Sequence, residues 1–590
     1  MKRLLSLVSL FLLLLLPSVF AQTLTKYITA TKGDTLVVKD EFDYSAPDAL
    51  TGLMTADTIN VPAGRVYQLH KNGYYSVINK PISSSRVRAI VAGESNALIK
   101  NNKSADAPPI LTGAVYEGNS SLGGIISGLD LLVKNVNINS GNSAATQGDY
   151  QVVGINPTGG RLTLDNCLLE HNLWVELAPP SMARLIFKNC YFVNLSGHTC
   201  RRNGGVIDFF NAFLDTIWVE NCTHVMTQGS LYKFRSGYQV NRVVFNHNDF
   251  INNSGYVFMN RGTVSNITVT NNIFVNSNVQ CYSTILNHLD GGETDPGSQP
   301  MGLVNVTPDS ALFKAPTGGH FYVDDNLVYW DPKFAAVPGV LNTKQTDGKT
   351  DWVSQAITMN ARTQAAFDNN VAYPYLVEGT WYKQLPTFAN TATLFTTQVT
   401  NLVTYISNCS DSTYTAPLPY WREVFPSATN FSYSDWPIPI NLSYTDAALL
   451  TGGLNKLPVG DLNWFPTQYK TWLAQRSAEY TQIANVLSTG KLSTGVKQLA
   501  GLPASYSLSQ NYPNPFNPTT VINYTIPKAG NVSLKVYNLL GQEVATLVNG
   551  YQSAAKYQVS FNASKLASGV YLYTIKADNF TQTMKMILMK

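Results

Sequence analysis

The sequence predicts an all-β protein, in which a long parallel β-helix is followed by a small C-terminal β-sandwich. Three observations predict this fold class. A short phrase of alternating apolar residues recurs in the middle of the chain, no helical pattern lies between its copies, and the last 84 residues carry a different set of alternating segments. Composition agrees, because only 13% of the 590 residues are charged while glycine (41) and tyrosine (32) are plentiful, as in extracellular β-proteins.

The recurrent phrase lies between residues 161 and 279 and reads apolar–any–apolar–any–Asn. Its five copies end at Asn166, Asn189, Asn221, His247 and Asn271, with steps of 23, 32, 26 and 24 residues. Alternation with period two predicts a short strand with one buried face. Recurrence at this period predicts stacked coils that bury one another's apolar sides, as in a solenoid.

Stacked coils predict vertical ladders of equivalent residues. Asn tolerates left-handed backbone angles, so we expect the Asn positions at a bend, with His247 as a deviation. Further copies at Asn135, Asp325 and Asn369 extend the solenoid both ways. A second ladder directly follows the first: Cys167, Cys190, Cys222, Asn248 and Asn272. A third lies three residues past the Asn position: Leu169, Phe192, His224, Phe250 and Phe274. The repeated cysteine position favours buried free thiols, although adjacent coils could bring two of them within bonding range.

These asparagine and apolar ladders resemble the right-handed β-helix of the pectate-lyase superfamily. The segments 67–79 and 87–93 resemble the opening coils of chondroitinase B and the alginate lyases. The resemblance implies a right-handed β-helix over residues 22–380 and an acidic polysaccharide as ligand or substrate, because a long flat face of parallel strands matches an extended sugar chain.

The N-terminus predicts export. Lys2 and Arg3 precede an apolar run from Leu4 to Leu16, and Val19-Phe-Ala21 before Gln22 is an acceptable cleavage site, so residues 1–21 are interpreted as a secretory signal peptide. No later stretch is long and apolar enough for a transmembrane helix. Removing Lys2 and Arg3 lowers the formal charge from +4 to +2, which gives no electrostatic case for nucleic acid.

Between residues 381 and 488 the repeat fades into an aromatic and proline-rich extension. Apolar residues at helical spacing after Pro466 predict an amphipathic helix that ends at Gly490. We expect this helix to cover the open end of the solenoid, whose exposed edge would otherwise invite aggregation. Residues 489–506, rich in Gly, Ser and Thr, are interpreted as a linker.

Residues 507–590 predict a β-sandwich of about seven strands by periodicity. The motifs Tyr-Pro-Asn-Pro-Phe-Asn-Pro from Tyr512, Leu-Gly-Gln from Leu540 and Ser-Gly-Val-Tyr from Ser568 stand in order. The domain resembles the type A C-terminal sorting domain of the type IX secretion system. This resemblance implies the secretion machinery as a partner, and release from the cell or attachment to its outer surface. An ordinary carbohydrate-binding sandwich is the alternative.

Three cations are candidate catalytic or uronate-binding residues. A polysaccharide lyase needs a base, usually Lys or Arg, and positive charge near the uronate carboxylate. Lys233 and Arg235 alternate on one predicted strand and therefore share a face, and Arg261 lies 26 residues after Arg235, about one coil on. The alternative is that all three are solvated surface cations. The catalytic pattern of chondroitinases and alginate lyases is not recognisable around them.

The loop from Asp290 to Asp295 is a candidate metal site. Asp290, Glu293 and Asp295 supply oxygen ligands, and two glycines between them favour a turn, which suits calcium. A plain solvated loop is the alternative, and no other cofactor is indicated. The sequence thus predicts a secreted or surface-attached β-helix protein that binds a polysaccharide or cell-surface glycan and, if it is an enzyme, cleaves it by β-elimination. A non-catalytic adhesion or scaffold protein is the rival hypothesis.

Overall fold

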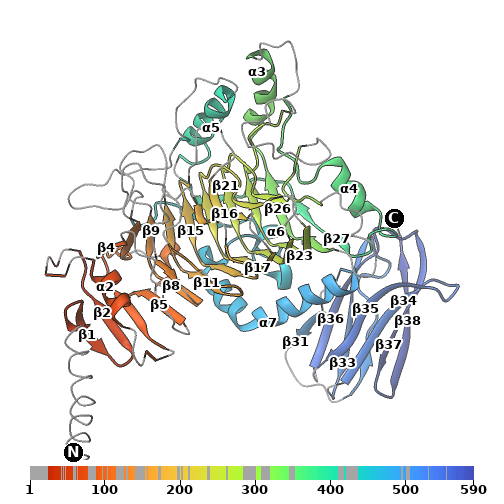
Figure 1. Cartoon of the computed structure of the whole chain (residues 1–590). Coiled ribbons are helices and arrows are strands. Elements are labelled where there is room, and N and C mark those ends of the chain that lie inside the picture. Colours follow the sequence, from red (N-terminus) through yellow and green to blue (C-terminus); the bar gives the residue numbers. More distant parts are fainter. Residues whose placement is uncertain are drawn as a thin grey trace, which may run out of the picture. The chain divides into compact units, whose positions relative to one another are not determined.

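Successive coils of the chain contribute parallel strands to three sheets, which Figure 1 shows as a stack of arrows from red and orange to green in the computed structural model. The structure describes residues 24–589, apart from gaps at 78–87, 114–124, 140–152, 284–299, 307–318, 345–351, 410–417, 420–435 and 500–504 and shorter interruptions such as 210–212, 236–238 and 261–262. The predicted signal peptide (residues 1–21) lies outside the described residues.

Sheet A is the longest of the three. It contains, in order, β1 (Ile28–Lys32), β2 (Thr35–Val38), β3 (Val66–Leu69), β5 (Arg88–Gly93), β8 (Asp130–Lys134), β11 (Arg161–Asp165), β14 (Arg184–Lys188), β17 (Phe213–Glu220), β20 (Gln239–Asn246), β23 (Thr263–Thr270), β25 (His320–Asp324) and β27 (Leu376–Glu378). Only β1 and β2 pair antiparallel; the other neighbours are parallel.

Sheet B follows sheet A within each coil. Its strands are β4 (Tyr74–Val77), β6 (Ile110–Gly113), β9 (Asn137–Asn139), β12 (Leu168–Glu170), β15 (Tyr191–Val193), β18 (Thr223–Val225), β21 (Asp249–Ile251), β24 (Ile273–Val275), β26 (Asn326–Tyr329) and β28 (Trp381–Tyr382). Sheet C completes the middle coils with β13 (Trp174–Leu177), β16 (Gly205–Phe209), β19 (Tyr232–Phe234) and β22 (Phe258–Asn260). A separate two-stranded parallel sheet, formed by β7 (Ile125–Ser127) and β10 (Val153–Ile155), lies beside β8, β11 and β13. The predicted all-β fold class is confirmed, and the long parallel sheets agree with a β-helix.

The predicted asparagine bend joins sheet A to sheet B. Its residues all have φ between 51° and 59°, the left-handed region that Asn adopts with little strain: Asn135, Asn166, Asn189, Asn221, His247, Asn271 and Asp325. A second left-handed bend, which the sequence analysis missed, follows sheet B at Asn194, Met226, Asn252 and Asn276. The expected copy at Asn369 is wrong, because the residues before it form a helix rather than a strand.

The interior of the solenoid contains the predicted apolar ladder. Phe192, His224, Phe250 and Phe274 occupy one register position and stack with ring centroids 4.4–5.1 Å apart. Cys167, Cys190 and Cys222 are buried free thiols, as expected. Burial raises the pKa of the Cys190 and Cys222 thiols, which disfavours the reactive thiolate. These ladders are therefore packing elements.

Short helices close the solenoid at its first and last strands. Helix α2 (Ala49–Ala56) buries Leu50, Leu53 and Met54 in the solenoid core beside β2 and β4. Helix α4 (Ala361–Asp368) places Phe367 in the same core beside β27.

The extension covers the outer face of sheet B. It contains β29 (Phe388–Asn390), α5 (Thr397–Asn408), β30 (Asn441–Tyr444), α6 (Ala447–Leu450), η4 (Leu454–Lys456), η5 (Leu462–Trp464) and α7 (Pro466–Thr489). Apolar residues from it, including Leu394, Ile440 and Trp464, pack on outward residues of sheet B such as Leu168 and Ile251. Three further short elements are η1 (Ile99–Asn101), η3 (Pro332–Ala336) and α3 (Val337–Lys344).

Helix α7 has the predicted boundaries but a different position. It starts at Pro466 and ends just before Gly490. In its first turns, the Tyr469 hydroxyl donates to Asn189 Oδ1 (3.0 Å), and Trp472 contacts the His247 ring. These contacts place the start of the helix along the asparagine bend of the middle coils, and not over an open end as expected. None of the described helices is long and apolar enough to cross a membrane.

The C-terminal strands form two antiparallel sheets that share one core. One contains β31 (Val496–Leu499), β36 (Ala555–Asn562), β33 (Thr519–Ile526) and β32 (Ser507–Leu508), in that order; the other contains β35 (Glu543–Gln552), β34 (Gly530–Tyr537), β37 (Gly569–Ala577) and β38 (Phe580–Leu588). Inward residues of both sheets pack together, as expected for a β-sandwich. Part of the expected linker forms strand β31, which pairs with β36. The chain divides into two compact units. The first comprises residues 1–453 and 457–474, and the second comprises residues 454–456 and 475–590.

Candidate functional site

The structure brings two of the three predicted cations together on the outer face of sheet C. Lys233 lies on β19 between the inward residues Tyr232 and Phe234, so its side chain is on the outer face. Its register partner on β16 is Asp208. Arg235, just past β19, donates two parallel hydrogen bonds to this carboxylate, from Nε to Oδ1 (2.9 Å) and from Nη2 to Oδ2 (2.6 Å).

This cluster is poorly suited to β-elimination. Lys233 is 1% exposed and Asp208 is 2% exposed, so a polymer has little access to the amine that would act as the base. Arg235 is the more exposed member, but Asp208 neutralises its guanidinium through the bidentate pair. A cation that is already paired offers a uronate carboxylate less attraction than a free one. The cluster therefore holds neighbouring coils together.

The remaining predicted site residues lie outside the described residues: Arg261, Asp290, Glu293 and Asp295. Within the described part of the chain, no three His, Cys, Asp or Glu side chains gather as ligands for a metal ion. The calcium hypothesis for residues 290–295 stays a prediction.

A second group of side chains, which the sequence analysis did not single out, lies on the outer face of sheet A. Arg242 on β20 lies over the ring of Trp218 on β17, with its guanidinium carbon 4.9 Å from the ring centroid. Two strands further on, His320 occupies the register position of Arg242 and stacks on Tyr375, with centroids 4.2 Å apart. All four side chains are partly exposed. The solenoid therefore presents two aromatic platforms on one face.

Arginines precede these platforms in the same register column. Arg161 on β11 pairs with Asp130 on β8 (2.8 Å), and Arg184 on β14 donates to the Gly159 carbonyl (3.0 Å). In this column Thr216 follows Arg184, and Asn266 follows Arg242. Neighbouring strands are about 4.8 Å apart, so the column offers a polar group at that interval along the axis. Alternation along the predicted strands could have indicated these residues, because the column residues lie one position before the recurrent phrase and therefore face outward, as does Trp218 within it.

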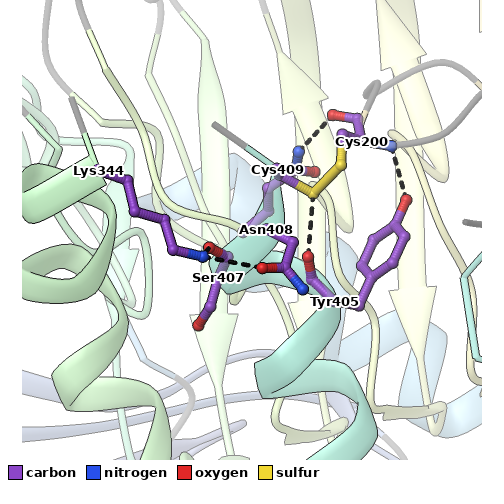
Figure 2. The surroundings of a disulfide bond; sticks show 7 residues. Cys200, Lys344, Tyr405, Ser407, Asn408 and Cys409 are labelled. Carbon is purple, nitrogen blue, oxygen red and sulfur yellow. Dashed lines mark hydrogen bonds between the residues drawn. A yellow bond between two sulfur atoms is a disulfide. The ribbon is translucent and has the colours of Figure 1, made fainter. Parts of the chain in front are cut away.

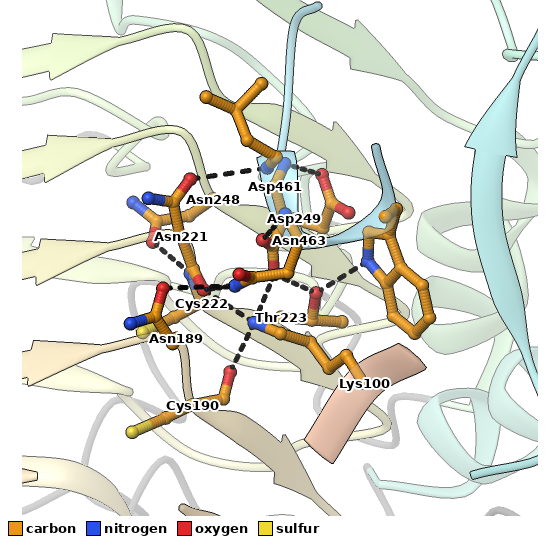
Figure 3. Close-up of polar contacts among 12 residues, drawn as sticks. Lys100, Asn189, Cys190, Asn221, Cys222, Thr223, Asn248, Asp249, Asp461 and Asn463 are labelled. Carbon is orange, nitrogen blue, oxygen red and sulfur yellow. Dashed lines mark hydrogen bonds and ion pairs between the residues drawn. The ribbon is translucent and has the colours of Figure 1, made fainter. Parts of the chain in front are cut away.

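A fully buried polar network fastens the extension to the asparagine bend (Figure 3). The Lys100 ammonium forms an ion pair with Asp461 and donates to the carbonyls of Cys190 (3.1 Å) and Asn221 (2.5 Å). Thr223 Oγ1 donates to the same Asp461 oxygen (2.8 Å). Lys100 and Asp461 are 361 residues apart in sequence, and both side chains are 0% exposed.

A second carboxylate, Asp249, belongs to this network. The Asp461 backbone N–H donates to Asp249 Oδ1 (3.0 Å). Burial and the neighbouring Asp461 charge raise the pKa of Asp249 well above its usual range. A side chain at position 460 would collide with Asp249, and Gly460 has φ +93°, so glycine permits this close approach. Solvent has no access to this network, so its role is structural. We call it the lock, because it holds the extension against the asparagine bend.

A disulfide joins Cys200 to Cys409 at the end of α5 (Figure 2). The Cys200 backbone N–H donates to the Tyr405 hydroxyl (2.7 Å), and Gln280 Nε2 donates to the Cys200 carbonyl (2.7 Å). Nearby, Lys344 donates to the Ser407 carbonyl (2.6 Å). This disulfide was not predicted, because its cysteines lie outside the repeated phrase.

In the C-terminal sandwich, the proline-rich motif and Asn511, the residue before it, are fixed to three strands. The Asn511 backbone N–H donates to the Tyr573 hydroxyl on β37 (2.8 Å), and its amide donates to Thr520 on β33 (2.9 Å). Asn514 Oδ1 accepts from the Ile587 backbone on β38 (2.8 Å). The motif is therefore part of the folded domain and not a flexible leader to it.

Residues 510–589 match the family model described as the secretion system C-terminal sorting domain. This unit is a type IX sorting domain. The protein is therefore exported by the type IX secretion system, whose machinery is its partner, and is released or attached to the cell surface. No curated protein matches the chain.

Proposed function

We propose that the exported solenoid binds an extracellular polysaccharide along the outer face of sheet A. The Trp218–Arg242 pair carries this proposal. Sugar rings have apolar faces that pack on aromatic rings, and their hydroxyls and carboxylates accept hydrogen bonds from guanidinium groups. The pair offers both kinds of contact on one partly exposed surface.

The setting of this pair supports the proposal. Trp218 on β17 and the His320–Tyr375 platform on β25 are three strands apart, or about 14 Å at 4.8 Å per strand. An extended polymer that runs along the solenoid axis could contact both platforms, and Asn266 lies between them for hydrogen bonding. The outer faces of the other two sheets suit a polymer less, because apolar residues of the extension cover sheet B and the Asp208–Lys233 cluster on sheet C is buried. The likeness of the ladders to the pectate-lyase superfamily points to the same ligand class.

Binding of the mature protein to a panel of neutral and acidic polysaccharides, with Trp218→Ala as the main variant, tests the proposal. We expect Trp218→Ala to weaken binding by about tenfold or more, the equivalent of about 1.4 kcal/mol. Trp436→Ala is the matched control, because Trp436 is also partly exposed but packs with the extension over sheet B. Equal affinity of Trp218→Ala and the unmodified protein would place the sugar elsewhere, and binding of no polysaccharide would refute the function.

A lyase that acts through Lys233, Arg235 and Arg261 is the second candidate. It is favoured by the shared outer face of Lys233 and Arg235 beside Asp208, and weakened by the burial of Lys233. The same polysaccharide panel tests it through the ultraviolet absorbance of newly formed unsaturated uronates, with and without calcium. Absorbance that rises with the unmodified protein but not with Lys233→Ala would establish the lyase.

A further inference from the structure

The turn between β34 and β35 of the sorting domain is held rigid by one asparagine. Asn538 Oδ1 accepts hydrogen bonds from the backbone N–H groups of Leu540 and Gln542, both at 3.0 Å. The Asn538 backbone N–H and side-chain amide donate to the Gln542 carbonyl (3.0 Å) and to its Oε1 (2.8 Å). Gly541, at φ +79°, completes the turn. One of these four hydrogen bonds joins Asn538 to Leu540 and three join it to Gln542, and together they leave this backbone little freedom.

The rigid turn displays two leucines to solvent. Leu539 is 69% exposed and Leu540 is 84% exposed, whereas Leu534 and Leu547 on the adjoining strands are buried in the core. The Lys535–Glu543 ion pair (2.8 Å) closes the strands at the base of the turn. A turn needs no leucine for its geometry, and polar residues usually occupy such tips. Two adjacent exposed leucines on a fixed backbone therefore call for an explanation outside the domain.

We propose that Leu539 and Leu540 form the contact by which the type IX secretion machinery recognises the folded sorting domain, and that they insert into an apolar pocket of a machinery protein. The domain's established role requires such a partner. Buried apolar anchors dominate binding energy at interfaces, and a backbone that is already fixed loses little entropy on binding. Asn538 is the positioning residue, because its side chain holds both leucines in place without contacting the pocket.

Secretion of the full chain from a bacterium that has the type IX system tests this proposal. The double variant Leu539→Ser/Leu540→Ser removes both apolar side chains from the turn. We expect at least about tenfold less protein in the medium and on the cell surface than for the unmodified chain, with the remainder retained inside the cell. Val371→Ser is the control, because Val371 is 95% exposed but lies outside the sorting domain. Asn538→Ala keeps both leucines but frees the turn, so we expect a smaller loss of export.

Thermal unfolding of the purified variants separates recognition from folding. Retention of a double variant that melts like the unmodified chain supports the proposal, and its normal export overturns it. If the double variant does not fold, Leu540→Gln decides in the same way, because it changes only the more exposed leucine. Two results would show that the turn contacts a different partner and would overturn the proposal. One is that the unmodified chain forms a dimer and the double variant is a monomer. The other is that the unmodified chain binds lipid vesicles and the double variant does not.

Discussion

At the scale of single residues, the chain depends on a few buried polar groups that connect distant segments. Lys100 is the clearest case, because its ammonium compensates Asp461 and also satisfies two carbonyls of the asparagine bend. A buried charge is tolerated only when it is paired and hydrogen-bonded, and breaking such a pair leaves the partner uncompensated. Lys100 thus contributes directly to the contact between the asparagine bend and the extension.

Replacing Lys100 with methionine should destabilise the solenoid strongly. Methionine has a similar length but no charge, so Asp461 would remain buried beside Asp249 without a cation. We expect a loss of about 3–5 kcal/mol in the free energy of unfolding, measured by chemical denaturation. Lys71→Met is the matched control, because Lys71 pairs with Asp106 on the surface and should change stability little. Equal effects of the two substitutions would show that the buried pair has no special importance.

Asp249 should make the stability of the solenoid fall as pH rises. Its pKa is raised in the folded state, so between the ordinary value of 3.8 and the higher folded value the folded protein binds more protons than the unfolded chain. Stability conferred by the protonated carboxyl is fully present below pH 3.8 and is lost as pH rises through the folded pKa. Asn carries the same acceptor oxygen without the charge.

Asp249→Asn should therefore be more stable than the unmodified protein at neutral pH, and the difference should disappear in acid. Denaturation over a pH series checks this, with the exposed Asp368→Asn as the control. A stability difference between Asp249→Asn and the unmodified chain that does not vary with pH would contradict the proposed linkage.

At the scale of elements, the sequence predicted those features that repeat from coil to coil. The asparagine bend, the phenylalanine ladder and the buried cysteines were predictable because each coil supplies an equivalent residue to the same environment. The second bend was missed because its residues lie five positions past the Asn position, outside the recurrent phrase. Lys100–Asp461 and Cys200–Cys409 join residues 361 and 209 positions apart, so no local pattern marks them. The two aromatic platforms were missed because Trp218 occupies an outward position of the phrase, where residues vary from coil to coil, and Tyr375 lies outside the phrase.

The disulfide should stabilise the chain by closing a long loop. Cys200 and Cys409 close 209 residues, which restricts the unfolded chain. We expect Cys200→Ser/Cys409→Ser to lower the free energy of unfolding by about 2–5 kcal/mol under oxidising conditions. A reducing agent should remove the difference between variant and unmodified chain. Thiol titration in denaturant provides a check, because Cys167, Cys190, Cys222 and Cys281 form no disulfide in the structure and should titrate as four thiols. Six titrated thiols would show that the disulfide does not form.

At the scale of the whole molecule, the protein consists of two compact units, to which we assign separate functions. Each unit has its own core: that of the solenoid runs from α2 to α4, and that of the sorting domain lies between its two sheets. The lock around Lys100 and Asp461 uses only residues of the first unit, up to position 474. Folding of the solenoid should therefore not depend on the sorting domain, whereas export should.

Deleting residues 507–590 tests this division. The deletion removes the family-matched domain and leaves the buried lock, the disulfide and the Trp218 face intact. We expect the truncated chain to be retained inside the cell, because the sorting domain is what directs export. The purified truncated chain should nevertheless keep the thermal unfolding transition of the solenoid and the polysaccharide affinity of the full chain. Loss of that transition would mean that the solenoid needs the sorting domain to fold. Normal export would mean that a second signal lies in the solenoid. Only retention with an intact transition agrees with two units of separate function, and an unchanged polysaccharide affinity would in addition show that the proposed sugar-binding face works without the sorting domain.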